Sequence, residues 1–165
     1  MNDTGSFTVT STVTLDSQAL ASKPVGYTAQ VVGERTANGS AWGLWFELTG
    51  SDGTTPFGVW HFGRLNADDT TFTGVVSSDL AELDTPVQLT GVFDAQDGMA
   101  HLYTGLVESG DGVPFAPVIG TGDLAVGEGP SGTGWGHYLP GTVSDVRIWA
   151  GAMTDGDQIA TTVGD

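Results

Sequence analysis

The chain contains no cysteine and very few basic residues, and both shortages exclude whole classes of site. Without cysteine there can be no disulfide framework, no thiolate metal site and no cysteine nucleophile. Only four Lys and Arg residues stand against 20 Asp and Glu, which gives a formal net charge of −16. No face can carry the basic stripe that nucleic acid requires, so nucleic acid is excluded as a partner.

Long apolar runs are also missing. A transmembrane helix needs roughly 18 or more apolar residues, and the opening MNDTGSFTV lacks the charged and apolar regions of a signal peptide. We therefore expect a soluble chain without membrane insertion that is either intracellular or cut from a longer precursor, and we favour the second alternative. Its acidic field should repel anionic lipids and anionic polysaccharides, while neutral glycans, cations and basic protein surfaces remain compatible.

Glycine, threonine and valine are abundant instead, and 26 of the 165 residues are glycine. Turn signals recur about every 8–12 residues, which is typical of all-β sandwiches. The length suits one domain, so we expect a single all-β domain over residues 1–165 with very little helix. A short C-terminal helical turn is expected after Thr154, a candidate N-cap followed by Asp155 and Asp157.

Alternation of apolar and polar residues predicts the strands. In the third strand Trp42 and Phe46 share one face, while Trp45 and Glu47 project from the other. Trp60 is expected in the core. The predicted strands and hairpins cover residues 6–15, 27–34, 42–50, 58–65, 86–107, 123–129 and 141–151.

Three segments together resemble one known family. They are DTGSFTV (3–9), VQLTGVFDAQDGMAHLY (87–103) and HYLPGTVSDVRIWAGAMTDGDQI (137–159). In this order they resemble the laminin-G-like, or concanavalin A-like lectin and glucanase, domains attached to bacterial secreted and wall-associated proteins. The resemblance implies an antiparallel jelly-roll β-sandwich of two sheets, commonly non-catalytic, that binds carbohydrate or protein and often holds calcium at its rim.

Two departures from the family pattern concern the edges of the fold. The strand that usually precedes DTGSF is missing, so the opening edge is incomplete or supplied by neighbouring sequence. The YVDGV-like hairpin of the family reads YTGLV, which predicts a rebuilt turn after Tyr103.

Sugar binding requires a flat aromatic face and planar polar groups in a shallow cleft. Trp45 with Glu47 on one strand face meets this requirement, and so does the segment GWGHY (134–138) with Trp135, His137 and Tyr138. Tryptophans of a β-sandwich also pack in the core, so ligand contact and packing both stay open for Trp45 and Trp135.

A rim calcium ion is the second site that the resemblance implies. The matching positions are Asp3 and Asp145, although Ser144 replaces an acidic residue common in the family. Asp145 and Arg147 share one strand face, which also predicts an ion pair. We interpret Arg147 as a structural clasp and leave Asp145 open between clasp and metal ligand.

Catalysis is not expected. The glucanase branch of the superfamily clusters carboxylates on one strand, whereas the glutamates here stand alone, and no GxSxG elbow is present. We therefore expect no enzyme, but a secreted or cell-surface recognition module that binds a neutral carbohydrate or glycoconjugate as an accessory or targeting domain. The alternative is a protein-interaction or structural module of an extracellular assembly.

Overall fold

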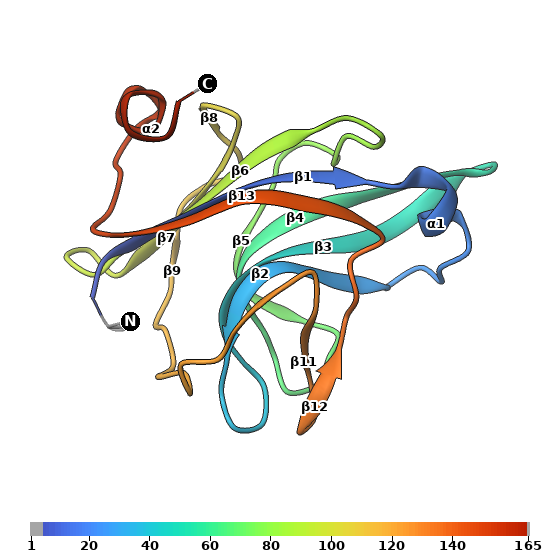
Figure 1. Cartoon of the computed structure of the whole chain (residues 1–165), viewed down its shortest axis with the longest axis horizontal. Coiled ribbons are helices and arrows are strands. Elements are labelled where there is room, and N and C mark those ends of the chain that lie inside the picture. Colours follow the sequence, from blue (N-terminus) through green and yellow to red (C-terminus); the bar gives the residue numbers. More distant parts are fainter. Residues whose placement is uncertain (1–4, 165) are drawn as a thin grey trace.

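The computed structural model describes residues 5–164, which form a sandwich of two antiparallel sheets (Figure 1). Both the all-β class and the two-sheet jelly-roll arrangement are confirmed. Asp3 lies outside the described residues. Among the described residues no helix is long and apolar enough to cross a membrane.

One sheet has six strands. Its order is β13-β1-β6-β7-β8, with β9 pairing with β7 beside β8. The first strand, β1, thus lies between the last strand, β13, and the β6–β7 hairpin (Figure 1). The first and last strands of the chain are therefore neighbours in one sheet. The strands are β1 (Phe7–Leu15), β6 (Val87–Asp94), β7 (Met99–Thr104), β8 (Val107–Glu108), β9 (Val113–Pro114) and β13 (Gly141–Ala150).

The other sheet has five strands in the order β10-β2-β3-β4-β5. Its central hairpin turns at Gly53, whose φ of 62° suits glycine in a tight turn. The strands are β2 (Thr28–Arg35), β3 (Ser40–Asp52), β4 (Thr55–Leu65), β5 (Phe72–Val76) and β10 (Leu124–Val126).

The core lies between the two sheets. Trp42 and Phe46 of β3 point into it as the alternation predicts, and Trp60 of β4 packs edge-on against Phe46 with ring centroids 5.5 Å apart. Phe7 of β1 packs across the interface on Trp42, with ring centroids 4.9 Å apart. Burial of these aromatic rings is the main stabilising contribution to the sandwich.

Two helices flank the sheets. The predicted C-terminal turn is α2 (Gly156–Val163), but its N-cap is Asp155, one residue later than predicted, because the Asp155 side chain accepts from the N–H of Gln158. The unpredicted α1 (Ser17–Ala21) is capped by Asp16 in the same way. Strand β5 was also not predicted.

A small hairpin completes the fold. Strands β11 (Gly129–Ser131) and β12 (Gly134–Gly136) pair with each other, and β11 packs against β2. The hairpin lies below the five-stranded sheet in Figure 1, and the chain then climbs from β12 to β13. It therefore covers part of the outer face of that sheet, where the candidate site residues were expected.

Candidate functional site

Trp45 lies on the outer face of the five-stranded sheet but is fully buried, with 0% of its surface exposed. His137 and Phe72 pack edge-on against its ring, with centroids 5.7 Å and 5.8 Å away, and Gly129 of β11 lies directly over it. The expectation of direct sugar contact does not fit Trp45, because the covering hairpin leaves no open face of the indole. Trp45 instead supports the loop that carries the other candidates.

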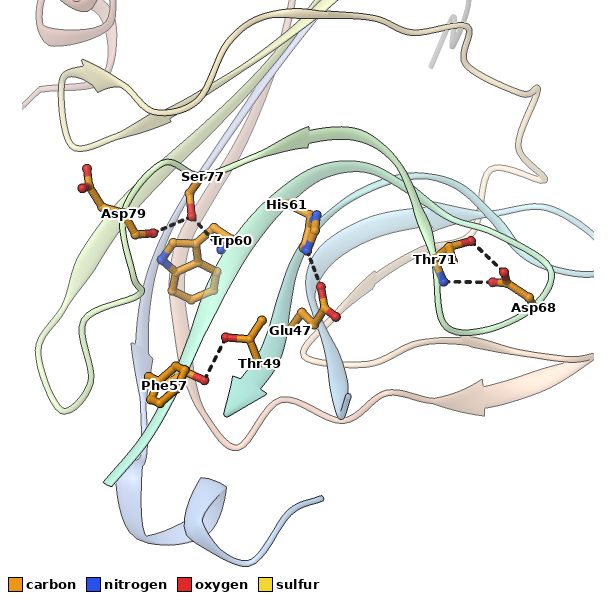
Figure 2. Close-up of polar contacts among 9 residues, drawn as sticks. All are labelled: Glu47, Thr49, Phe57, Trp60, His61, Asp68, Thr71, Ser77 and Asp79. Atoms are coloured by element: carbon orange, nitrogen blue, oxygen red, sulfur yellow. Dashed lines mark hydrogen bonds and ion pairs between the residues drawn. The ribbon is translucent and has the colours of Figure 1, made fainter. Parts of the chain in front are cut away.

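Glu47, two residues further along β3, is paired with His61 of β4. The Nε2 atom of His61 lies 2.8 Å from Oε2 of Glu47, as Figure 2 shows. One face of the imidazole stacks on Phe72 with ring centroids 4.0 Å apart. Burial lowers the pKa of His61 below its usual 6.5, and the bond to Glu47 offsets only part of that effect. Burial therefore favours the neutral form of the imidazole in this pair.

His137 is held between β2 and the loop after β4. Its Nδ1 atom lies 2.8 Å from the hydroxyl of Thr28, and its Nε2 atom lies 4.0 Å from a carboxylate oxygen of Asp69. Both His137 and Asp69 have left-handed φ values, 49° and 57°, which are uncommon for residues other than glycine. His137 thus fixes the direction in which the following residue leaves the sheet.

The loop that carries Asp69 is ordered by its neighbour Asp68. The Asp68 carboxylate accepts hydrogen bonds from the backbone N–H of Thr70 and from the N–H and hydroxyl of Thr71; the Thr71 contacts are drawn in Figure 2. These bonds lower the pKa of Asp68 to about 2. The loop beside His137 is therefore built by its own side chains.

Trp135 is partly exposed, with 36% of its surface accessible, as expected for a loop tryptophan flanked by glycines. The guanidinium of Arg35 lies over one face of the indole, 4.5 Å from the ring centroid. This cation–π contact holds the ring against the end of β2. An indole held in this way keeps its orientation without being buried.

Tyr138 is the most exposed of the predicted sugar-binding residues, at 59%. It borders a hollow of about 290 Å³ together with Tyr27 and Lys23. The Tyr27 hydroxyl donates to the backbone carbonyl of Tyr138, and the Tyr138 hydroxyl donates to the carbonyl of Trp135 at 3.4 Å. The Lys23 ammonium lies over the Tyr27 ring, 4.9 Å from its centroid. We call this the tyrosine hollow.

Sequence reasoning missed Tyr27 and Lys23. Burial raises the pKa of Tyr27, so its hydroxyl is a neutral donor. Nothing local connects Tyr27 with Tyr138, which is 111 residues away. The sequence offered one signal for a role of Lys23, because it is the single lysine of the chain and one of only four basic residues.

Asp145 occupies a β-bulge on the edge strand β13. Thr10 and Thr12 of β1 pair with Arg147 and Ser144, so β13 carries one extra residue there, and Asp145 has a φ of 51°. One of its carboxylate oxygens, Oδ1, accepts from Nε of Arg147 at 2.8 Å. Within residues 5–164 no group of three or more acidic or histidine side chains could hold a metal. With Asp3 undescribed, calcium binding at this rim stays a prediction.

No family model and no curated protein matches the sequence. Solved structures do match, at identities that show the fold alone. A heptameric pentraxin from Limulus polyphemus has a TM-score of 0.63 at 16% identity, covering 97% of this chain and 70% of its own. The CBM40 of a Ruminococcus gnavus sialidase, bound to α2,3-sialyllactose, has a TM-score of 0.63 at 10% identity, covering 96% of this chain and 83% of its own.

A Bacteroides ovatus protein named as a carbohydrate-binding candidate has a TM-score of 0.60 at 15% identity. The match covers 94% of this chain and only 40% of that protein. The chain therefore spans less than half the length of this larger relative in structure. Together these likenesses show the jelly-roll β-sandwich fold.

Proposed function

We propose that the chain is a non-catalytic recognition module that binds a neutral carbohydrate or glycoconjugate at the tyrosine hollow. The domain would serve as an accessory or targeting module, secreted or displayed at the cell surface. Tyr138 and Tyr27 contact the sugar, and Trp135 precedes Tyr138 by three residues, its backbone carbonyl accepting from the Tyr138 hydroxyl.

One observation carries the proposal. Tyr138 exposes most of its ring beside a hollow, while its backbone carbonyl is fixed by the Tyr27 hydroxyl. An exposed aromatic ring next to hydrogen-bonding groups is what a pyranose needs, because its C–H face packs on the ring while its hydroxyls find polar partners. The backbone at Tyr138 is already held before a ligand binds, so it does not have to be ordered by the ligand.

Charge supports a neutral ligand. At a net charge of −16 the protein repels polyanions, and the repulsion is strongest at low salt. Calcium at the predicted rim site, Asp3 and Asp145, would stabilise the fold, and Asp145 does not line the tyrosine hollow. Sugar binding in this proposal does not depend on it.

The pairing of Glu47 supports a role without catalysis. Glycoside hydrolysis generally uses two carboxyl groups that flank the scissile bond. Glu47 is bound to a buried, neutral His61 instead, and the ring of His61 is stacked on Phe72. Fold likeness to the Ruminococcus gnavus module, which binds a glycan, agrees with recognition and is an analogy only.

The test is a glycan array with and without calcium, followed by titration of the best neutral hit. Tyr138→Ala should weaken binding by about 1–3 kcal/mol, the magnitude of a lost aromatic contact, with little change in melting temperature. The matched control is Tyr103→Phe, a buried tyrosine of β7. An array without any glycan hit, or unchanged binding by Tyr138→Ala, contradicts the proposal.

A second candidate function is protein interaction, and one observation favours it. The edge strand β10 exposes Leu124 and Val126, each at 50% accessibility, and Ile119 nearby is also exposed. An apolar edge strand can pair with a strand of another chain. A pull-down from native culture medium tests this, and Leu124→Lys should abolish the capture if the edge is the interface.

A further inference from the structure

We propose that the ligand is a linear neutral oligosaccharide that extends from the tyrosine hollow across two further hollows beside α1, and not a single terminal sugar. This rests on the proposed function. The three hollows lie around α1 and share lining residues, and we call them together the α1 groove. Figure 1 shows α1 beside the far ends of β3 and β4.

The hollows adjoin through shared lining residues. Lys23 borders both the tyrosine hollow and a middle hollow of about 220 Å³. Ala21, Thr54 and Pro56 border both the middle hollow and a third of about 430 Å³, at the tip of the β3–β4 hairpin. One chain of sugar units can therefore pass from Tyr138, over Lys23, to Thr54.

The α1 groove is free of acidic side chains along its lining in the described structure. This is unusual in a chain with 20 acidic and four basic residues. A hollow on the opposite side, by contrast, is lined by Asp94, Asp97 and His101. The lining thus carries the Lys23 ammonium and no carboxylate, which leaves room for a neutral ligand.

Hydroxyl groups take the place of charge in the groove. Each serine or threonine hydroxyl can both donate and accept a hydrogen bond, which matches the mixed donors and acceptors of a sugar chain. Tyrosine rings at one end supply the flat apolar surface. The hydroxyl-bearing residues that line the groove are Ser17, Ser22, Ser51, Thr54, Thr55, Tyr27 and Tyr138.

Lys23 lies where two hollows meet. Its ammonium contacts the Tyr27 ring and makes no ion pair within residues 5–164, whereas Arg147 pairs with Asp145. Arg35 and Arg64 each donate to a backbone carbonyl as well as lying over a ring. The Lys23 ammonium has three N–H donors, which can bind oxygen atoms of two successive sugar units at this junction.

The experiment titrates the protein with linear neutral oligosaccharides, from monosaccharide to hexasaccharide, of the sugar that scores highest on the array. Affinity should rise with length by about tenfold or more overall, and then level off once the groove is filled. If oligosaccharides longer than the disaccharide bind no more tightly than the disaccharide, the extended groove is overturned and the proposed function stays intact. No binding at any length would overturn both.

Thr54→Trp fills the hairpin end of the groove without touching the tyrosine hollow. It should reduce hexasaccharide affinity about tenfold, to the disaccharide level, and leave disaccharide binding unchanged. Gln96→Trp, at the exposed β6–β7 turn, is the matched control and should change neither. Ala21→Gln, on α1, is a second blocking variant in case Thr54→Trp does not fold.

Two outcomes of these titrations contradict the inference. Equal hexasaccharide affinity in Thr54→Trp, Ala21→Gln and the parent chain would show that the ligand does not enter the outer hollows. Tighter binding of a uronic-acid oligomer than of its neutral counterpart, in physiological salt, would show that Lys23 selects for charge and that the ligand is acidic.

Discussion

The Nε atom of Arg147 donates to a carboxylate oxygen of Asp145 at 2.8 Å, and its Nη1 atom donates to the Val163 carbonyl at the end of α2, 3.3 Å away. Arg147 therefore ties the edge strand β13 to the last turn of the chain, as predicted for a clasp. Both side chains are about half exposed, and such a pair contributes about 0–1 kcal/mol. The bulge and its charges also discourage strand pairing at this edge.

The backbone at Asp145 can be tested separately from its charge. Asp145→Ala and Asp145→Gly remove the same carboxylate, but only glycine suits a φ of 51°. Asp145→Gly should be more stable than Asp145→Ala by about 1 kcal/mol, because a side chain is strained in the left-handed region. Urea unfolding with equal m-values measures the difference. Equal stabilities would mean that the bulge relaxes when the carboxylate is lost.

The same two variants test calcium. If Asp145 and Asp3 are ligands, saturating calcium should raise the melting temperature, since about 2.7 kcal/mol is gained at a hundred times Kd. Both Asp145→Ala and Asp145→Gly should lose that increase. A melting curve of the parent chain that is the same in calcium and in chelator leaves Asp145 as a partner of Arg147 alone.

Strand positions were predictable because the alternation of apolar and polar residues is a local signal. Strands β1 and β3 lie where this alternation predicted them, with Phe7, Trp42 and Phe46 in the core. Several short elements were missed, among them β5, α1 and the β11–β12 hairpin. Strand β5 has only five residues with Gly74 in its middle, so its alternation is weak. The signal for α1 was present, since Asp16 caps it and Pro24 follows its end, but a five-residue helix has too little apolar periodicity to detect.

The candidate site was predictable only in part. Alternation assigned Trp45 to the outer face correctly, but it could not show that the glycine-rich hairpin 129–136 folds back over that face. The exposure of Trp135 followed from its glycine neighbours. The partnership of Tyr138 with Tyr27 and Lys23 depends on contacts across more than a hundred residues, which no local pattern encodes.

The buried His61 gives the fold a dependence on acid pH. Its pKa is lowered in the folded state, so the unfolded chain binds the proton more readily. Stability should therefore be complete above the usual pKa of 6.5 and fall as the pH decreases from 6.5 towards the folded-state value. His61→Gln should flatten this part of the profile, measured by urea unfolding across the pH range.

The control for this experiment is His101→Gln, which removes a more exposed histidine that also pairs with a glutamate, Glu108. It should keep more of the fall in stability below pH 6.5 than His61→Gln does. If both variants flatten the profile equally, burial of His61 is not the cause of the pH dependence.

Two tryptophans should separate recognition from stability. Trp60 is buried and packed on Phe46, so Trp60→Ala should cost about 3–5 kcal/mol of folding free energy by leaving a cavity. Trp135 is partly exposed and held by Arg35, a contact that contributes about 0.5–1 kcal/mol at such sites. Trp135→Ala should therefore change stability little but weaken binding of the best neutral glycan by about 1–3 kcal/mol.

Calorimetric titration and urea unfolding on the same two variants complete this test. The two variants should differ in what they lose. Trp135→Ala should lose affinity at nearly full stability, whereas Trp60→Ala should lose stability. If Trp135→Ala unfolds the domain, the indole is a structural lid over β2 and Arg35. If it keeps both stability and affinity, the sugar contacts Tyr138 without reaching Trp135, because the Arg35 guanidinium already occupies one face of that ring.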